Sequence, residues 1–102
     1  METLEFVFQG DRAAAVPAHH AIAGVVSSGN LEVLVEGASQ DGAMRIVVNT
    51  AATGFGPIWR AVLTDFSIRH ALANVLITIN DAGATPAVVS LRLDQAVEEF
   101  EG

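Results

Sequence analysis

Apolar and polar residues alternate at the start of the chain, which is the pattern of a β-strand with one buried face. Leu4, Phe6 and Phe8 fall on one side of the segment 3–8, because successive side chains of a strand point to opposite faces. Residues 9–18 break this alternation. We therefore expect an N-terminal strand at 3–8, followed by a loop.

Two further apolar runs flank a short polar tip. Residues 19–26 become β-branched towards their end and residues 31–36 alternate, so both are predicted to be strands. The tip between them reads SSGN. Its Gly29-Asn30 dipeptide tolerates the positive φ of a two-residue hairpin turn. Ser28 is then the last residue before the turn, or part of it.

Strands are also predicted at 43–49 and 75–79, where apolar residues again alternate. Between them, Pro57 suits the first turn of a helix, because its missing N–H costs no hydrogen bond there. The helix is predicted to run over 57–72, with Asn74 as a left-handed stop. Its apolar residues recur at helical spacing, and they are Trp59, Val62, Leu63 and Phe66.

A second helix is predicted to follow Thr85-Pro86, which resembles a helix cap and a first-turn proline. Its apolar residues fall on one helical stripe: Val89, Leu93, Ala96, Val97 and Phe100. Residues 87–93 contain adjacent valines and alternate over a few positions, so a strand is the alternative there. We prefer the helix.

These elements predict one domain, because a chain of 102 residues is the size of a single domain. The core is expected over 19–102, with the strand at 3–8 and the loop at 9–18 preceding it. Four strands, a helix, a strand and a helix fit an α+β fold. We predict a small, mostly antiparallel sheet with two helices packed on one face.

Composition narrows the classes of partner. Twelve acidic residues stand against five arginines and no lysine, a formal net charge of −7. Such a chain repels phosphate backbones, so no nucleic-acid partner is expected. The apolar runs are too short to span a bilayer, and the acidic start lacks the basic and apolar regions of a secretory signal. We expect no membrane partner and a cytoplasmic location.

Cysteine is absent from the chain, which excludes disulfides and cysteinyl metal sites. Any thioester chemistry would therefore take its sulfur from a cofactor. The absence of lysine also excludes a lysine Schiff base.

No metal-binding or catalytic constellation stands out in the sequence. His19 and His20 are adjacent, so on a strand they would point to opposite faces. His70 falls near the predicted helix C-terminus, where a positive charge is favourable. Asp81 precedes a glycine turn, in which Asp commonly accepts hydrogen bonds from the downstream backbone. We expect structural roles for these residues, with no catalytic residue and no metal.

The serines of the tip remain as candidates. A serine that another enzyme modifies must be exposed, on a segment that can enter a foreign active site, and loop tips on rigid scaffolds meet that need. Ser28 meets it better than Ser67 or Ser90, which fall in predicted regular structure. An ordinary hairpin turn is the alternative interpretation.

Three segments carry a resemblance to a known family: GVVSSGNLEVLVE (24–36), FGPIWRAVLTDFSIRH (55–70) and ITINDAGATPAVVSLRLDQAVEE (77–99). Together they resemble the acyl carrier (delta) subunit of bacterial malonate decarboxylase, over nearly the whole chain and with the same order and spacing. The chain is more distantly similar to the acyl carrier (gamma) subunit of citrate lyase. The resemblance implies an α+β carrier, in contrast to the helical-bundle acyl carriers.

The resemblance also implies a prosthetic group. In the family, a serine in a Ser-Gly-Asp turn carries 2'-(5''-phosphoribosyl)-3'-dephospho-CoA through a phosphodiester link. This motif maps onto Ser28, Gly29 and Asn30. The sequence departs from it with Asn30 in place of the usual acid. It also has Ser27 where glycine is expected, which makes Ser27 a second, less favoured acceptor.

The function implied by the resemblance is that of a non-catalytic subunit. It would bear acetyl and malonyl thioesters on the arm during decarboxylation of malonate to acetate and CO2. The implied partners are the transferase (alpha) and decarboxylase (beta and gamma) subunits, a malonyl transferase and the prosthetic-group transferase. The alternatives are the citrate lyase acyl carrier subunit, a non-catalytic acidic adaptor domain and an independent small enzyme.

Overall fold

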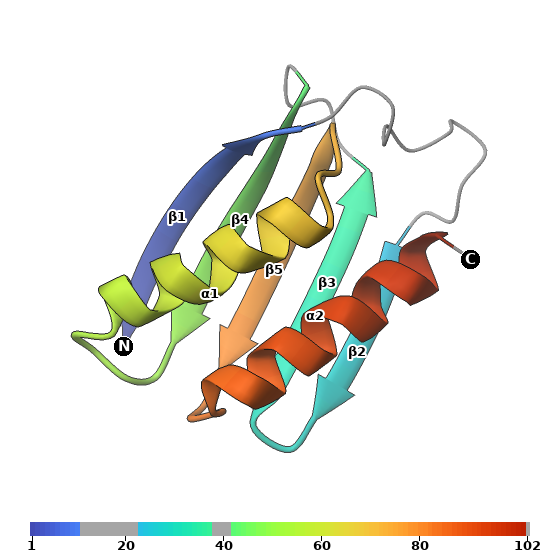
Figure 1. The fold of residues 1–102 in the computed structure, drawn as a ribbon. Coiled ribbons are helices and arrows are strands. Elements are labelled where there is room, and N and C mark those ends of the chain that lie inside the picture. The colour runs from blue at the N-terminus through green and yellow to red at the C-terminus, as the bar shows by residue number, and fades with distance from the viewer. Residues whose placement is uncertain (11–22, 38–41, 102) are drawn as a thin grey trace.

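Five strands form one sheet, and two helices lie across one of its faces (Figure 1). This computed structural model describes residues 1–10, 23–37 and 42–101, and for 23–26 and Ser28 it describes the backbone alone. The α+β architecture predicted from the sequence is confirmed, including the placement of both helices on the same face.

The strands are β1 (Glu2–Gln9), β2 (Ala23–Ser28), β3 (Leu31–Gly37), β4 (Ala43–Thr50) and β5 (Val75–Asp81). They lie in the order β1-β4-β5-β3-β2, so β1 and β2 are the edges. Neighbours are antiparallel except for β4 and β5, which are parallel. A parallel pair needs a crossover connection, and α1 (Gly56–Arg69) supplies it.

The core lies between the sheet and the helices. Val33, Ile46 and Ile77 alternate with more exposed neighbours on their strands and are fully buried. The second helix, α2 (Pro86–Glu101), covers β2 and β3. Its start after Thr85 is confirmed, and the Val88 N–H donates to Thr85 Oγ1 at 3.3 Å. The buried residues of α2 are those of the predicted stripe: Val89, Leu93, Ala96, Val97 and Phe100.

The first helix confirms the predicted stripe but not the predicted end. Its buried residues include Trp59 and Phe66. It ends at Arg69 and not at residue 72, and the His70 N–H donates to the Phe66 carbonyl at 2.8 Å. Leu72 is nevertheless buried. The spacing of apolar residues cannot distinguish the last turn of a helix from a buried connecting segment. The predicted helix was therefore too long at its C-terminal end.

Other boundaries also differ from the prediction. Asn74 has the expected positive φ of 57°, but it lies directly before β5 and does not end the helix. The second strand continues to Ser28, two residues beyond the predicted end at 26. Gln9, predicted as loop, belongs to β1. The remaining parts of these predictions, at 11–18 and 19–22, lie outside the described residues.

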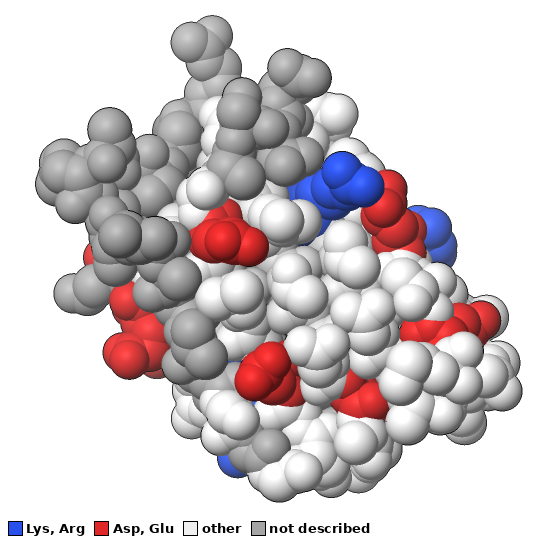
Figure 2. Space-filling view, turned by 180° about the vertical axis from the view of Figure 1, so that it is seen from behind, with Lys and Arg blue, Asp and Glu red and all other residues white. Residues whose placement is uncertain are grey.

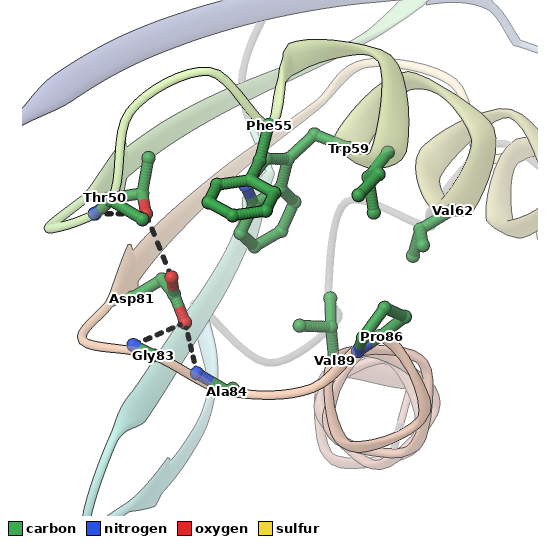
Figure 3. A pocket seen from close by; sticks show the side chains of 11 residues that line it. Thr50, Phe55, Trp59, Val62, Asp81, Gly83, Ala84, Pro86 and Val89 are labelled. Atoms are coloured by element: carbon green, nitrogen blue, oxygen red, sulfur yellow. Dashed lines mark hydrogen bonds between the residues drawn. The ribbon is translucent and has the colours of Figure 1, made fainter.

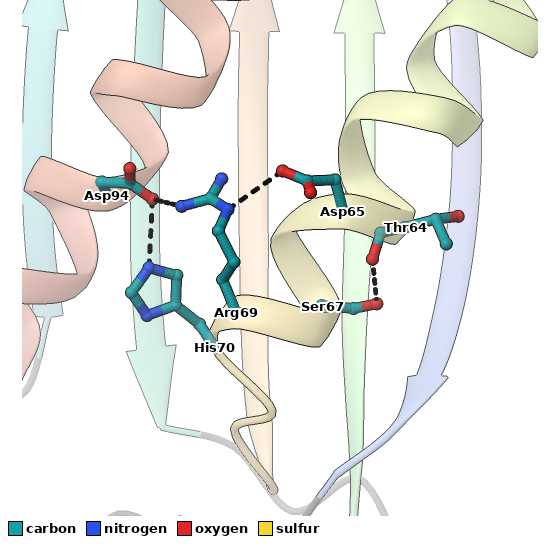
Figure 4. A network of polar contacts seen from close by, with 6 residues as sticks. All are labelled: Thr64, Asp65, Ser67, Arg69, His70 and Asp94. Carbon is teal, nitrogen blue, oxygen red and sulfur yellow. Dashed lines mark hydrogen bonds and ion pairs between the residues drawn. The ribbon is translucent and has the colours of Figure 1, made fainter.

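A polar cluster joins the two helices at the surface (Figure 4). From α1, Arg69 donates to Asp65 at 2.9 Å and to Asp94 of α2 at 2.6 Å. His70 Nε2 lies 3.0 Å from the same Asp94 oxygen. The hydrogen bonds to Asp94 and then Asp65 raise the pKa of the Arg69 guanidinium. These side chains remain substantially exposed, so water screens the charges.

The Arg69→Gln variant should therefore lose little stability. We expect its free energy of unfolding to fall by less than about 1 kcal/mol, because exposed ion pairs contribute little. Phe66→Ala, which removes a fully buried ring from the same helix, should cost about 3–5 kcal/mol. Urea denaturation measures both variants. A loss on Arg69→Gln as large as that on Phe66→Ala would contradict the surface role.

Gly10 follows β1 in a position with no space for a side chain. Its N–H donates to the Gly42 carbonyl at 3.0 Å. A Cβ there would lie 2.5 Å from Ala73 Cα, 2.5 Å from the Gly42 oxygen and 2.6 Å from the Leu72 oxygen. All three are backbone atoms, which cannot rotate away as a side chain can. The close approach therefore requires glycine.

Gly10→Ala should lower the free energy of unfolding by about 1–3 kcal/mol, the usual cost of overpacking. Gly29→Ala is the matched control, because nothing lies within 4 Å of a Cβ at that position. Its effect should stay within about 0.5 kcal/mol, as for an exposed substitution. Equal effects of the two substitutions in urea denaturation would refute the close-packing argument.

Candidate functional site

The SSGN tip is a tight hairpin at the edge of the sheet. Ser28, the last residue of β2, pairs with Leu31, the first residue of β3, which leaves Gly29 and Asn30 as the turn. The predicted hairpin is thus confirmed. Ser27, Gly29 and Asn30 are exposed. The side chain of Ser28 lies outside the described part of the structure, so the predicted exposure of its hydroxyl stays a prediction.

The turn differs from the prediction in its backbone. Among the described residues, positive φ occurs at Asn74, Gly42, Gly54 and Gly83, a set that does not include Gly29 or Asn30. Two-residue turns with negative φ at both central positions also exist, and sequence alone does not choose between the two kinds. Although Gly29 and Asn30 tolerate a positive φ, the turn therefore does not require that conformation of either residue.

A hydrogen-bonded junction holds the hairpin against the neighbouring β5–α2 turn. The Ala82 N–H donates to the Asn30 carbonyl at 2.9 Å. Asp81, only 8% exposed, fixes that turn, because its Oδ1 accepts from the N–H groups of Gly83 at 3.2 Å and Ala84 at 2.8 Å (Figure 3). Its Oδ2 accepts from Thr50 Oγ1 at 2.8 Å. The turn role predicted for Asp81 is confirmed.

The two serines stand at the ends of two different cross-strand rows. The row of Ser28 crosses the sheet through Leu31, Asp81, Thr50 and Glu2. The row of Ser27 crosses it through Glu32, Asn80, Asn49 and Thr3. Adjacent rows belong to opposite faces of a sheet, because side chains alternate along each strand.

The Ser27 row is a continuous polar chain on the face opposite the helices. Thr3 Oγ1 donates to Asn49 Oδ1 at 3.1 Å, Asn49 Nδ2 donates to Asn80 Oδ1 at 3.2 Å, and Asn80 Nδ2 donates to Glu32 Oε1 at 3.1 Å. A shallow groove of about 350 Å³ runs beside it, with Ser27 among its lining residues. Figure 2 shows that this face consists mostly of uncharged side chains, with scattered acidic side chains and a few basic ones.

The helix side of the same molecular end contains an apolar pocket of about 270 Å³ (Figure 3). Trp59 and Val62 of α1 face Val89 and Pro86 of α2 across it, and Phe55 stands before α1 at its mouth. Thr50 and Asp81, from the Ser28 row, also line it. Apart from the apolar stripes of the two helices, nothing in the sequence indicated this pocket. It forms between the first turns of α1 and α2, and the sequence of neither helix specifies their separation.

The three histidines were the remaining candidates from the sequence. His70 contacts Asp94, as described above, while His19 and His20 lie outside the described residues. Within the described ranges, no three His, Cys, Asp or Glu side chains gather as metal ligands. The helices in those ranges are also too short or too polar to cross a membrane.

The fold and this site define a class of protein: a small α+β domain that presents a serine-containing hairpin at a sheet edge. The family described as malonate decarboxylase delta subunit (MdcD) matches residues 18–100. The chain therefore belongs to the malonate decarboxylase delta-subunit family.

Individual relatives agree with this assignment. The chain is 61% identical over its whole length to a malonate decarboxylase acyl carrier protein of Xanthomonas euvesicatoria, covering 97% of that protein. A Burkholderia cepacia protein of the same name is 60% identical, with 97% of this chain and 90% of the relative covered. A chain in the crystal structure of a Pseudomonas malonate decarboxylase hetero-tetramer with malonate superimposes with a TM-score of 0.76 at 39% identity, covering 98% of this chain and 99% of that one.

The junction at Asp81 can be tested by substitution. Asp81→Ala should lower the free energy of unfolding by about 2–3 kcal/mol, because it leaves the buried Thr50 hydroxyl and two part-buried turn N–H groups without their acceptor. Asp81→Asn is the matched control and should lose less, since an amide offers the turn N–H groups an oxygen and Thr50 a donor. Urea denaturation measures the loss, and hydrogen exchange at the Ala82 N–H reports whether the hairpin contact loosens. Equal losses in both variants would contradict the hydrogen-bonding role.

Proposed function

We propose that this chain is the acyl carrier subunit of malonate decarboxylase and that it carries 2'-(5''-phosphoribosyl)-3'-dephospho-CoA on Ser28. The thiol of that group would bear acetyl and malonyl in turn as thioesters while malonate is converted to acetate and CO2. The chain itself performs no chemistry in this proposal. Family membership and the hairpin geometry support it.

The observation that carries the proposal is the exposed, anchored hairpin on an edge strand. Among the described strands, β2 has a neighbour on one side only, so a modifying enzyme can approach the tip from outside the sheet. The hydrogen bond from Ala82 to Asn30 fixes the turn to the domain. A fixed, exposed tip suits recognition by another enzyme better than a frayed loop, because little ordering is needed on binding.

The residues at the tip fit a covalently attached group. Gly29 leaves open space where a Cβ would stand, so the residue that follows Ser28 adds no side chain beside the attachment position. A cysteine-free chain offers no competing thiol. When bound, the group supplies the sulfur for thioester formation. The chain contributes tethering, which keeps the thioester at a high effective concentration near successive partner sites.

The partners follow from the same proposal. They are the alpha, beta and gamma subunits of malonate decarboxylase, a malonyl transferase and the enzyme that attaches the prosthetic group. An acidic carrier with net charge −7 would be attracted to basic surfaces on these partners, which accelerates encounter at low salt.

Ser28→Ala should abolish attachment of the arm and malonate decarboxylation while the domain remains folded. The expected stability change is within about 0.5 kcal/mol, which follows from the predicted exposure of the Ser28 hydroxyl. Intact-mass measurement of the chain, coexpressed with the other malonate decarboxylase proteins in a native host, reports attachment directly.

Ser27→Ala is the matched control and should remain modified, because the family motif maps onto Ser28. If Ser28→Ala carries the arm and Ser27→Ala does not, the acceptor is Ser27. If the wild-type chain shows only its unmodified mass under these conditions, the carrier proposal fails and an acidic adaptor becomes the better interpretation.

A further inference from the structure

The apolar pocket between the helix starts is not needed by the attachment chemistry proposed above. Its walls are mainly Phe55, Ile58, Trp59, Val62 and Val89. Phe55 and Ile58 are 47% and 46% exposed, so the apolar lining is open to solvent. The volume of about 270 Å³ lies just below the roughly 300–1,000 Å³ of typical small-molecule pockets. Only a small group can enter.

Sheet register places this pocket near the proposed attachment residue. Asp81, which lines the pocket, is followed along its row by Leu31 and then Ser28. Two strand spacings put the backbone of Ser28 about 10 Å from that of Asp81. The hydrogen bond between Ala82 and Asn30 fixes this separation. A long flexible arm on Ser28 can therefore fold back to the pocket of its own carrier.

The lining selects between the two acyl groups that the arm would bear. Among its described lining residues there is no Lys, Arg or His, and the ionisable member is Asp81. The free carboxylate of a malonyl thioester would lose its hydration against apolar walls and meet a second carboxylate, both unfavourable. An acetyl thioester carries no charge, and its methyl group is suited to apolar walls.

We infer that the pocket binds the acetyl thioester end of the arm on its own carrier and leaves the malonyl thioester outside. This inference rests on the proposed function. Tethering at an effective concentration on the order of millimolar allows even a weak site to be filled. The consequence is that the acetyl form is shielded from water and nucleophiles between partner visits, while the malonyl form stays available to the decarboxylase.

Trp59 provides the readout, because it is the single tryptophan of the chain and lines the pocket. The unmodified chain is titrated with S-acetylpantetheine and, separately, with S-malonylpantetheine. Binding is followed by the NMR signal of the Trp59 indole N–H. A saturable shift is expected with the acetyl compound and none with the malonyl compound, up to about 10 mM. No shift with either, or equal shifts with both, overturns the inference.

A second measurement uses the modified chain, after intact mass has verified the arm. Acetylated and malonylated forms are exposed to hydroxylamine, and thioester lifetimes are compared between wild type and Ala84→Leu, which narrows the pocket. Half-occupancy of the pocket would lengthen the acetyl lifetime about twofold in wild type relative to Ala84→Leu. The malonyl lifetimes should be equal. Ala61→Leu, on an exposed position of α1 outside the pocket lining, is the matched control.

The outcomes separate this inference from the proposed function. A chain without the arm in the mass spectrum contradicts the carrier function, while the titration of the unmodified chain still tests the pocket. An arm that is present, with acetyl lifetimes equal in wild type and a folded Ala84→Leu, overturns the pocket inference alone. If Ala84→Leu does not fold, the titration decides.

Discussion

The position of the hairpin depends on one buried carboxylate. Asp81 ends β5 and accepts hydrogen bonds from Thr50 of β4 and from the turn that leads into α2. Within that turn, the Ala82 N–H donates a hydrogen bond to the Asn30 carbonyl of the hairpin. Burial of an acid without donors would be costly, so its satisfied geometry is strongly preferred. Strand ends, a helix start and the serine hairpin are thereby held in one arrangement.

The sheet register then gives the two neighbouring serines different surroundings. Ser27 stands at the end of a polar row on the face away from the helices, and the side-chain hydrogen bonds of that row run from Thr3 to Glu32. Ser28 ends the row that includes Asp81 and Thr50, both of which line the apolar pocket. A shift of register by one residue would exchange the two, because strand positions alternate between faces. The pairings of β2 with β3 and of β3 with β5 together determine which serine belongs to the pocket row.

This arrangement suits a carrier in the proposed role. The hydrogen-bonded junction around Asp81 holds the SSGN hairpin in place on this small domain. The same end of the molecule carries the hairpin, the starts of both helices and the pocket between them (Figure 1). A substituent at the tip would reach partner sites by moving outward and would reach the pocket by folding back. The carrier could therefore influence the exposure of its cargo without a catalytic residue.

Sequence by itself determined the elements and their buried faces. The stripe from Val89 to Phe100 predicted α2 correctly, and alternation predicted the strands, because both periods follow from backbone geometry. The three segments 24–36, 55–70 and 77–99 together indicated the family, because the residues of each motif are contiguous in the chain.

Tertiary structure alone decided how those elements meet. Thr50 and Asp81, or Asn49 and Asn80, become partners only because β4 and β5 lie parallel and in register, 31 residues apart in the chain. The strands predicted at 43–49 and 75–79 extend to Thr50 and Asp81 in the structure, so both pairs stand at or just beyond the predicted strand ends. The sequence of one strand does not encode which strand lies beside it. The end of α1 and the pocket beside Trp59 likewise depend on contacts between distant segments, and no periodicity within one segment can report those contacts.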